Sequence, residues 1–150
     1  MKRLYEIAGR LVFILSYPAV QLLVGRQKRA YLLLRCGDEV LLVKNWYGNG
    51  RWSLPGGGLH ASETAELGLK REVMEEVGYD IAGLKLKGPE SFKSAVGLTH
   101  KPCLVFCAEI GAKPDLRLNS FELTGAAWYR AEEITSLPVW PEVKAALQAF

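Results

Sequence analysis

The chain has 150 residues, of which 49% are hydrophobic and 23% are charged, and its formal net charge is +3. This length suits one domain that can bury a core, and the composition excludes an intrinsically disordered chain. The charge is compatible with an anionic substrate but too small to indicate nucleic-acid binding by itself, so we expect no stable nucleic-acid partner.

Residues 1–25 carry an apolar run between basic flanks. The apolar part, 11–24, is shorter than the ~20 residues of a membrane span, and no small-residue cleavage site follows it. A helix ending or kinking near Pro18 is predicted, because apolar residues recur at helical spacing at Leu4, Ile7, Leu11, Ile14 and Leu15. Three interpretations stay open: a helix packed on its own domain or on a second copy in a homodimer, a helix on a membrane surface, and a targeting segment.

The next segment predicts a hairpin and a glycine-rich turn. Apolar runs at 31–35 and 40–44 flank a polar stretch at 36–39, which is the pattern of a β-hairpin. A loop at 45–51 and a short strand at 52–54 lead to the sequence Pro-Gly-Gly-Gly at 55–58. We expect a turn there, because glycine adopts positive φ and lets the backbone approach a ligand closely.

A helix is predicted from Ser62, as its N-cap, to Gly78, with Glu63 and Glu66 in the first turn. Gly68 lowers the stability of such a helix by ~1 kcal/mol relative to alanine, and nothing in the sequence explains it. Two sides of the helix are apolar, so we expect both to be covered: one has Leu69, Val73 and Val77, and the other has Leu67 and Met74.

Three glutamates crowd another part of this predicted helix. At ~100° per residue, Glu72, Glu75 and Glu76 fall within roughly 100° of one another, whereas Glu63 falls ~180° from Glu72. Like charges so close repel, and a hard divalent cation such as Mg²⁺ or Mn²⁺ would turn that repulsion into a binding site.

The remaining chain predicts more strands and a closing helix. The strands are expected at 84–87, 90–93, 103–110 and 126–130, with a helical turn at 131–134 and a helix at 141–150. Strands before, between and after helices are typical of an α+β fold or an α/β sandwich. The cysteines are odd in number, and Cys103 and Cys107 fall in an apolar run, which favours buried thiols. We therefore expect a reducing, cytoplasmic location, with contact to a membrane surface left open by the N-terminus.

The segment 57–79 resembles the Nudix box of the MutT-like pyrophosphohydrolases, G-x5-E-x7-R-E-U-x-E-E-x-G-U, where U is a bulky apolar residue. Tyr79 departs from the last apolar position, and eight positions match: Gly57, Glu63, Arg71, Glu72, Val73, Glu75, Glu76 and Gly78. The resemblance implies an α+β fold, the Nudix-type α/β/α sandwich with a mixed sheet, for residues 28–150. The helix at 1–25 would be an addition to it.

The resemblance also implies roles for these residues, with Mg²⁺ or Mn²⁺ as the cofactor. Glu75 and Glu76 would be the main metal ligands, Glu72 a ligand or the general base, and the carbonyl of Gly57 a further ligand. Arg71 would act with Glu72 and Glu75 in the catalytic group by holding the glutamates in place, and Glu63 would be structural. Because Arg71 lies just outside the acidic side, contact with a substrate phosphate is the alternative.

A fourth acid lies far away in sequence. Glu122 precedes Trp128 by six residues, and some MutT-like members have a glutamate at this spacing in the metal site. A solvated loop residue is the equally weighted alternative. Other residues have weaker cases. Arg51 and Lys101 could contact a phosphate, with plain solvent exposure as the alternative, and Trp46 and Tyr47 could stack on a base. Trp52 is expected in the core, and His60 and His100 are expected at the surface.

The resemblance implies hydrolysis of a diphosphate linkage in a nucleoside diphosphate derivative. Markers of the NADH, ADP-ribose, dinucleoside polyphosphate and coenzyme A subgroups are absent, which leaves nucleoside triphosphates and nucleotide sugars, along with other nucleoside diphosphate derivatives. The alternative is a non-catalytic Nudix-fold module that binds a nucleotide ligand.

Overall fold

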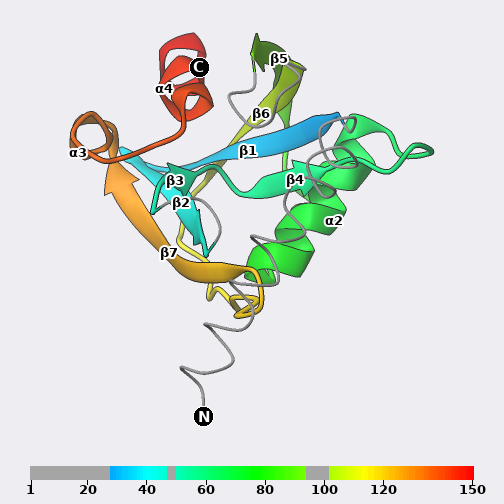
Figure 1. The fold of residues 1–150 in the computed structure, drawn as a ribbon, viewed down its shortest axis with the longest axis horizontal. Helices are drawn as coiled ribbons and strands as arrows, with labels where there is room; N and C mark the ends of the chain where they lie inside the picture. The colour runs from blue at the N-terminus through cyan, green and yellow to red at the C-terminus, as the bar shows by residue number, and fades with distance from the viewer. Residues whose placement is uncertain (1–27, 47–49, 94–101) are drawn as a thin grey trace, which may run out of the picture.

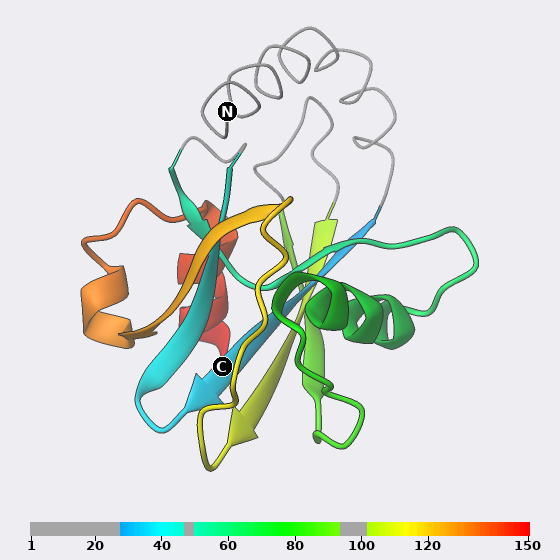
Figure 2. The same ribbon diagram turned by 90° about the horizontal axis from the view of Figure 1, so that it is seen from below.

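The computed structural model describes residues 28–46, 50–93 and 102–150. These residues form a mixed sheet of seven strands with helices on both faces, as Figures 1 and 2 show. The strands are β1 (Arg29–Cys36), β2 (Glu39–Asn45), β3 (Trp52–Ser53), β4 (Gly56–Gly58), β5 (Lys87–Lys93), β6 (Pro102–Ile110) and β7 (Leu123–Arg130). The helices are α2 (Ala65–Val77), α3 (Ala131–Ile134) and α4 (Pro141–Ala149).

Strand β1 is the centre of the sheet. It runs parallel to β6 along its whole length and antiparallel to β2 and β4, in the strand order β3-β2-β1-β6-β5. The predicted hairpin is confirmed: Cys36 pairs with Glu39, and Gly37 adopts a φ of 63° in the turn. The β7 strand pairs with β2 on the side away from β1, which brings the chain before Leu123 to the end of β2.

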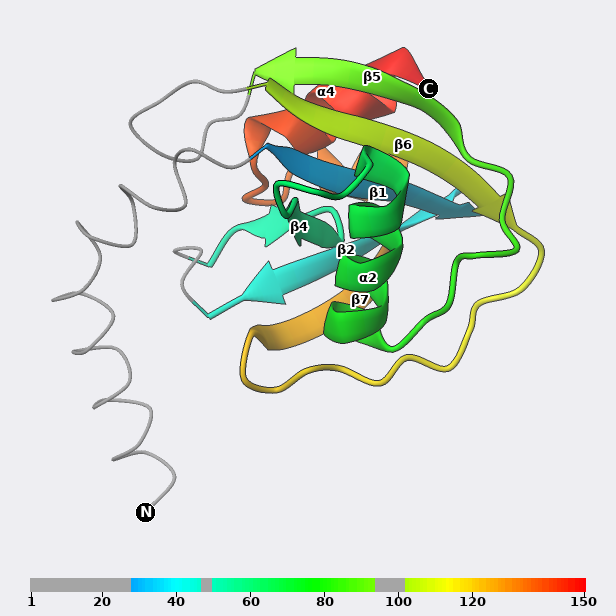
Figure 3. The ribbon, with the colours of Figure 1, turned by 90° about the vertical axis from the view of Figure 1, so that its right-hand side faces the viewer.

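The sheet separates two apolar cores because side chains alternate between its faces. On the face covered by α2, Leu32 and Leu34 of β1 are buried together with Leu69 and Val73 of the helix. On the other face, Tyr31 and Leu33 are buried, and the α4 residues Val143 and Ala146 lie in the same core. Figure 3 shows α2 lying across one face of the sheet, with α4 on the opposite face. The predicted α+β sandwich is therefore confirmed.

Two of the predicted elements are wrong. Residues 55–58 are not simply a turn, because Gly56–Gly58 forms strand β4 against the start of β1. A Cβ atom on Gly56, whose φ is 133°, would lie 2.2 Å from the carbonyl oxygen of Ala30, so only glycine permits this pairing. The strand predicted at 84–87 is absent except for Lys87, which begins β5. The half-buried Leu84 and Leu86 instead cover the core beside α2 without joining the sheet.

The expectation that both apolar sides of α2 are covered is also wrong. Leu69, Val73 and Val77 are fully buried, but Leu67 and Met74 are 59% and 44% exposed. The reason is architectural: α2 has the sheet on one side only, and no second layer of the described residues lies beyond it.

The thiol prediction is confirmed for the core, since Cys103 and Cys107 are buried and unpaired. Burial raises the pKa of the Cys103 thiol to about 11. Among the described residues, no helix has the length and apolarity needed to cross a bilayer. The predicted N-terminal helix at 1–25 lies outside the described residues, as do Tyr47, His100 and Lys101.

Candidate active site on helix α2

Helix α2 begins two residues later than predicted. Its N-cap is Thr64, whose side-chain oxygen accepts a hydrogen bond from the Leu67 N–H at 3.3 Å, and not Ser62. The predicted end is confirmed: Gly78 has a φ of 65° and donates its N–H to the Met74 carbonyl. Glu63 therefore precedes the helix, where its carboxylate accepts a hydrogen bond from the His60 N–H at 2.9 Å.

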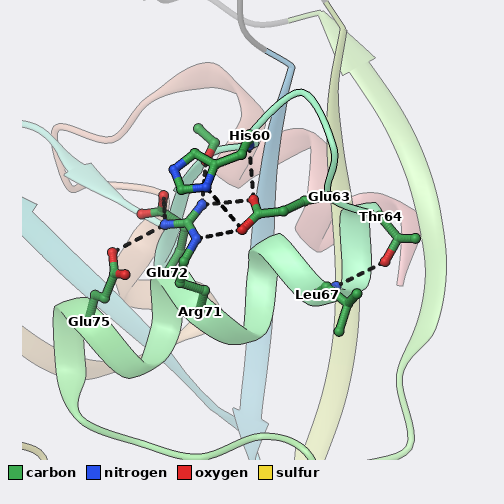
Figure 4. Close-up of polar contacts among 8 residues, drawn as sticks. His60, Glu63, Thr64, Leu67, Arg71, Glu72 and Glu75 are labelled. Atoms are coloured by element: carbon green, nitrogen blue, oxygen red, sulfur yellow. Dashed lines mark hydrogen bonds and ion pairs between the residues drawn. The ribbon is translucent and has the colours of Figure 1, made fainter.

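Arg71 joins three glutamates and a backbone carbonyl, an arrangement that we call the Arg71 bracket (Figure 4). Its guanidinium donates two hydrogen bonds to Glu63, at 2.7 and 3.0 Å. Its Nη1 donates to Glu72 at 2.8 Å and to Glu75 at 3.2 Å, and its Nη2 donates to the Gly58 carbonyl at 3.0 Å. The expectation that Glu63 faces away from the other acids is wrong, because it lies outside the helix and shares Arg71 with Glu72.

In the bracket, the positive charge of Arg71 offsets part of the negative charge of the glutamates. The hydrogen bond from Arg71, followed by that from the His60 backbone, lowers the pKa of Glu63 to about 2. The same contact with Glu63, with smaller contributions from Glu72, raises the pKa of Arg71. His60 is largely exposed, as expected, and its Nδ1 lies 3.2 Å from Glu63. All three guanidinium nitrogens already have protein acceptors, which supports the holding role over contact with a phosphate.

The bracket also accounts for Gly68, which the sequence left unexplained. A Cβ atom at this position would lie 2.3 Å from Cδ2 of the buried Leu59 and 2.9 Å from Oε2 of Glu63. The loop before the helix therefore folds back onto Gly68, and this close approach carries Glu63 to Arg71. The helix loses some intrinsic stability at Gly68 so that the loop can reach the bracket.

Glu76 lies in a contrasting environment on the sheet side of the helix. Its side chain is only 3% exposed and accepts a hydrogen bond from the Gly56 N–H of β4 at 2.8 Å. Burial, with smaller contributions from the nearby charges of Glu72 and Glu122, raises the pKa of Glu76 to about 8. The Gly56 N–H and the Asn45 side chain act in the opposite direction by hydrogen bonding to the carboxylate.

Glu72 belongs to the bracket and also borders β4. One of its oxygens accepts from Arg71, and the other would lie 2.4 Å from a Cβ atom on Gly57. Burial raises the pKa of Glu72, and Glu75 and Glu122 add to this effect, while Arg71 opposes it. The absence of a side chain at Gly57 is therefore what lets a carboxylate of α2 meet the backbone of β4.

Glu122 reaches this site from the turn before β7. It is an exposed residue, yet its charge raises the pKa of both Glu72 and Glu76. The turn is tied to the end of α2, since the Asn119 N–H donates to the Glu76 carbonyl at 2.9 Å. The fold thus places Glu72 and Glu76 against β4 with Glu122 near enough for its charge to act on both, while Glu75 is 53% exposed and linked to Glu72 through Arg71.

The chemistry of these residues fits a hard divalent cation. Carboxylates outnumber the single arginine of the bracket, and Glu76 is buried with a raised pKa, so added positive charge would be favourable. In the part of the chain that the structure describes, however, no three His, Cys, Asp or Glu side chains are grouped closely enough to hold a metal ion. Glu72 and Glu75 each direct one oxygen to Arg71, so binding would require side chains to turn.

Sequence reasoning missed two residues that hold the acids. Asn45 hydrogen-bonds to Glu76, and Asn119 ties the turn that contains Glu122 to α2. Neither lies in the motif, and the only signal is that Asn45 ends an apolar strand. Two weaker candidates lie outside the site: Trp52 packs in the core of the α4 face, as expected, and the exposed Arg51 stacks 5.0 Å from the Trp140 ring.

Comparison with known proteins agrees with this geometry. The NAD-capped RNA hydrolase NudC of Pseudomonas syringae pv. tomato is 29% identical over 134 residues, 89% of this chain and 46% of the relative. The mouse oxidized purine nucleoside triphosphate hydrolase is 29% identical over 102 residues, 67% of this chain and 63% of the relative. The chain thus spans less than half the length of the NudC relative.

A solved structure of the Nudix hydrolase RenU from M. smegmatis has a TM-score of 0.69 and 25% identity, covering 83% of each chain. The model of the NUDIX domain matches residues 25–150, which includes every described element. This chain therefore belongs to the NUDIX domain family.

Proposed function

We propose that this chain is a metal-dependent pyrophosphohydrolase that cleaves a diphosphate linkage in a nucleoside diphosphate derivative. The observation that carries the proposal is the placing of two carboxylates of α2 against the glycines of β4: the Gly56 N–H donates to Glu76 at 2.8 Å, and Oε2 of Glu72 would lie 2.4 Å from a Cβ atom on Gly57. Membership in the NUDIX family supports it. The names of the two relatives also support a nucleotide-type substrate, since one acts on NAD-capped RNA and the other on oxidized purine nucleoside triphosphates.

In this proposal Glu72, Glu75, Glu76 and Glu122 hold Mg²⁺ or Mn²⁺, together with the carbonyl of Gly57. A bound divalent cation would offset the negative charge of the diphosphate and lower the pKa of water. The protein residues do the rest: Arg71 fixes Glu72 and Glu75, and β4 donates to Glu76 and orients it. A carboxylate that keeps one oxygen unligated, with Glu72 as the first candidate, accepts the proton of the attacking water.

The substrates we propose are nucleoside triphosphates and nucleotide sugars. A panel should also include NAD-capped RNA and dinucleoside polyphosphates, which test the exclusions drawn from the missing markers. Each compound is incubated with the full chain and Mg²⁺ or Mn²⁺, and the products are separated by chromatography. We expect cleavage at a diphosphate linkage that stops when the metal is chelated.

The control for this experiment is Glu66→Gln, which removes an exposed acid from the first turn of the same helix. It should cleave like the wild type, whereas Glu76→Gln should not. Tight nucleotide binding without turnover of any compound would favour the non-catalytic binding module and contradict the proposal.

For residues 1–25, we propose an apolar helix covered by its own domain, by a second copy of the chain or by a membrane surface. Deleting these residues should preserve cleavage and change the oligomeric state or solubility, as measured by size-exclusion chromatography. Retention of the full chain on lipid vesicles, with loss of retention on truncation, would select the membrane surface. A truncated chain with unchanged size and solubility would contradict an interface.

A further inference from the structure

We propose that Trp46 is a positioning residue for Glu122, holding the turn before β7 so that this carboxylate is directed at Glu72 and Glu76. The inference rests on the proposed function, in which Glu122 contributes to the cation site. It concerns a residue outside the Nudix motif, at the end of β2.

Trp46 binds two successive carbonyl groups of the turn. Its indole Nε1–H donates to the Phe121 carbonyl at 2.7 Å, and its backbone N–H donates to the Glu122 carbonyl at 3.3 Å. Lys44 of β2, two residues before Trp46, makes a further link, since its carbonyl accepts a hydrogen bond from the Thr124 hydroxyl at 3.0 Å. The end of β2 therefore holds the chain on both sides of Glu122.

Asn119 holds the same turn from the opposite side. Its side-chain oxygen accepts from the Phe121 N–H, and its carbonyl accepts from the Glu122 N–H, both at 3.1 Å. Its own N–H donates to the Glu76 carbonyl, so the turn is attached to the helix residue whose side chain is the buried acid. Both backbone polar groups of Glu122 are therefore used, one toward Asn119 and one toward Trp46.

Hydrogen bonds, and not burial, give this turn its order. The Phe121 side chain is 88% exposed, so it anchors nothing in a core. Among the bonds that hold the turn, the one from the Trp46 indole is the shortest, at 2.7 Å. Without it, an exposed turn would sample more conformations, and the Glu122 carboxylate would be directed at the site for less of the time.

Two consecutive residues at the end of β2 thus form hydrogen bonds to two acidic residues that are far apart in sequence. Asn45 hydrogen-bonds to the side chain of Glu76, and Trp46 fixes the backbone of Glu122. Partners that orient metal ligands without touching the metal commonly change its affinity by about 10- to 100-fold when they are removed. Trp46 has the geometry of such a partner.

The test is a double-mutant cycle on Mn²⁺ binding to the substrate-free full chain, followed by the electron paramagnetic resonance signal of free Mn²⁺. Trp46→Phe keeps an aromatic ring and removes the indole donor. We expect Trp46→Phe and Glu122→Gln each to weaken Mn²⁺ binding by about 10-fold. The double variant should bind no more weakly than Glu122→Gln, because Trp46 acts through Glu122.

Trp140→Phe is the matched control, since it removes an indole on the α4 face and should bind Mn²⁺ like the wild type. Wild-type affinity in Trp46→Phe, or a further loss when it is combined with Glu122→Gln, would overturn the inference. If Trp46→Phe does not fold, Asn119→Ala enters the same cycle, because it releases the turn by removing the acceptor of the Phe121 N–H.

The cycle also separates this inference from the proposed function. If Glu122→Gln binds Mn²⁺ normally while Glu76→Gln does not, the role of Trp46 fails and the proposed enzyme stands. If Glu76→Gln also binds normally, the proposed cation site itself fails.

Discussion

The Arg71 bracket and the surroundings of Glu76 are two acidic regions less than two turns of helix apart, with opposite electrostatics. In the bracket, Arg71 and the His60 backbone lower the pKa of Glu63 to about 2. On the sheet side, burial and neighbouring acids raise the pKa of Glu76 to about 8. The same residue type is therefore stabilised as an anion in one region and destabilised as an anion in the other.

The difference shows which acids need an external cation. The bracket already contains its own positive charge, so it is suited to fixing geometry. Glu76, with Glu72 and Glu122 near it, has hydrogen bonds but a pKa raised to about 8, so a divalent ion would lower the free-energy cost of keeping its carboxylate charged. A motif that looks like one acidic cluster in sequence thus has two parts in space: Arg71 and Glu63 support the arrangement, and Glu72 and Glu75 connect them to the candidate cation site beside Glu76.

The largest effect is expected from removing the acid of the sheet side. Glu76→Gln should lower kcat by on the order of 10²-fold or more, because a charged ligand that the transition state needs is lost. Steady-state cleavage of the best substrate of the panel measures this, with Glu66→Gln as the control. Turnover like that of the wild type in Glu76→Gln would show that the region assigned as the site is not the site.

The pH dependence of stability distinguishes the two regions without substrate. Since the folded-state pKa of Glu76 is about 8, above its unperturbed value of 4.5, its contribution to the free energy of unfolding is fully present below pH 4.5 and is lost as the pH rises through 8. Metal-free wild type should therefore lose on the order of a few kcal/mol over this window relative to Glu76→Gln. Mg²⁺ should reduce the loss.

Urea unfolding at a series of pH values checks this prediction, because the free energy of unfolding of both variants is obtained in the same conditions. Parallel curves for the wild type and Glu76→Gln would contradict the raised pKa. The bracket should behave in the opposite way: its contribution is lost only at acid pH, as the pH falls from 4.5 through about 2 and Glu63 is protonated.

Loosening the bracket should have an intermediate effect. Arg71→Lys keeps the positive charge but loses the planar fork that donates to Glu63, Glu72 and Glu75 together. We expect kcat to fall by about 10-fold, because the glutamates are oriented less well. An unchanged kcat with a raised KM would instead support the alternative in which Arg71 contacts a substrate phosphate.

A smaller effect is expected at Gly68. Alanine gains intrinsic helix stability there, but its Cβ would press on Leu59 and on the Glu63 carboxylate. We expect Gly68→Ala to lower Tm by about 2–4 °C, since overpacking outweighs the gain in propensity. Gly83→Ala is the control, because a Cβ at Gly83 meets nothing within 4 Å. A higher Tm in Gly68→Ala would show that the loop before α2 moves away freely.

Much of the site could be predicted because its acids lie on one helix. The spacing of Glu72, Glu75 and Glu76 and the apolar residues Leu69 and Val73 already define a helix with one side against a sheet. The predicted N-cap Ser62 differs from the observed N-cap Thr64 because both residue types suit that position, and only the fold-back of the loop onto Gly68 decides between them.

The parts that could not be predicted depend on contacts distant in sequence. Helical spacing predicts that Glu63 faces away from Glu72, but Glu63 lies before the helix, where that spacing does not apply. The burial of Glu76 comes from the approach of β4, which is itself permitted by the closeness of Gly56 to Ala30. Asn45 and Trp46 support acids 31 and 76 residues further along the chain, and no local pattern carries that information.

If the cation binds beside Glu76, as proposed, then Arg71 and Glu63 do not touch it and only hold Glu72 and Glu75 in place. The most direct test is a calorimetric titration of Mg²⁺ into substrate-free wild type, Glu76→Gln and Glu63→Gln at one pH, with unfolding measured in parallel. We expect Glu76→Gln to lose binding by about 10-fold or more, and Glu63→Gln to stay within about threefold of the wild type while unfolding more easily. Equal losses of Mg²⁺ affinity in both variants, or a tenfold loss in Glu63→Gln alone, would contradict binding of the cation beside Glu76.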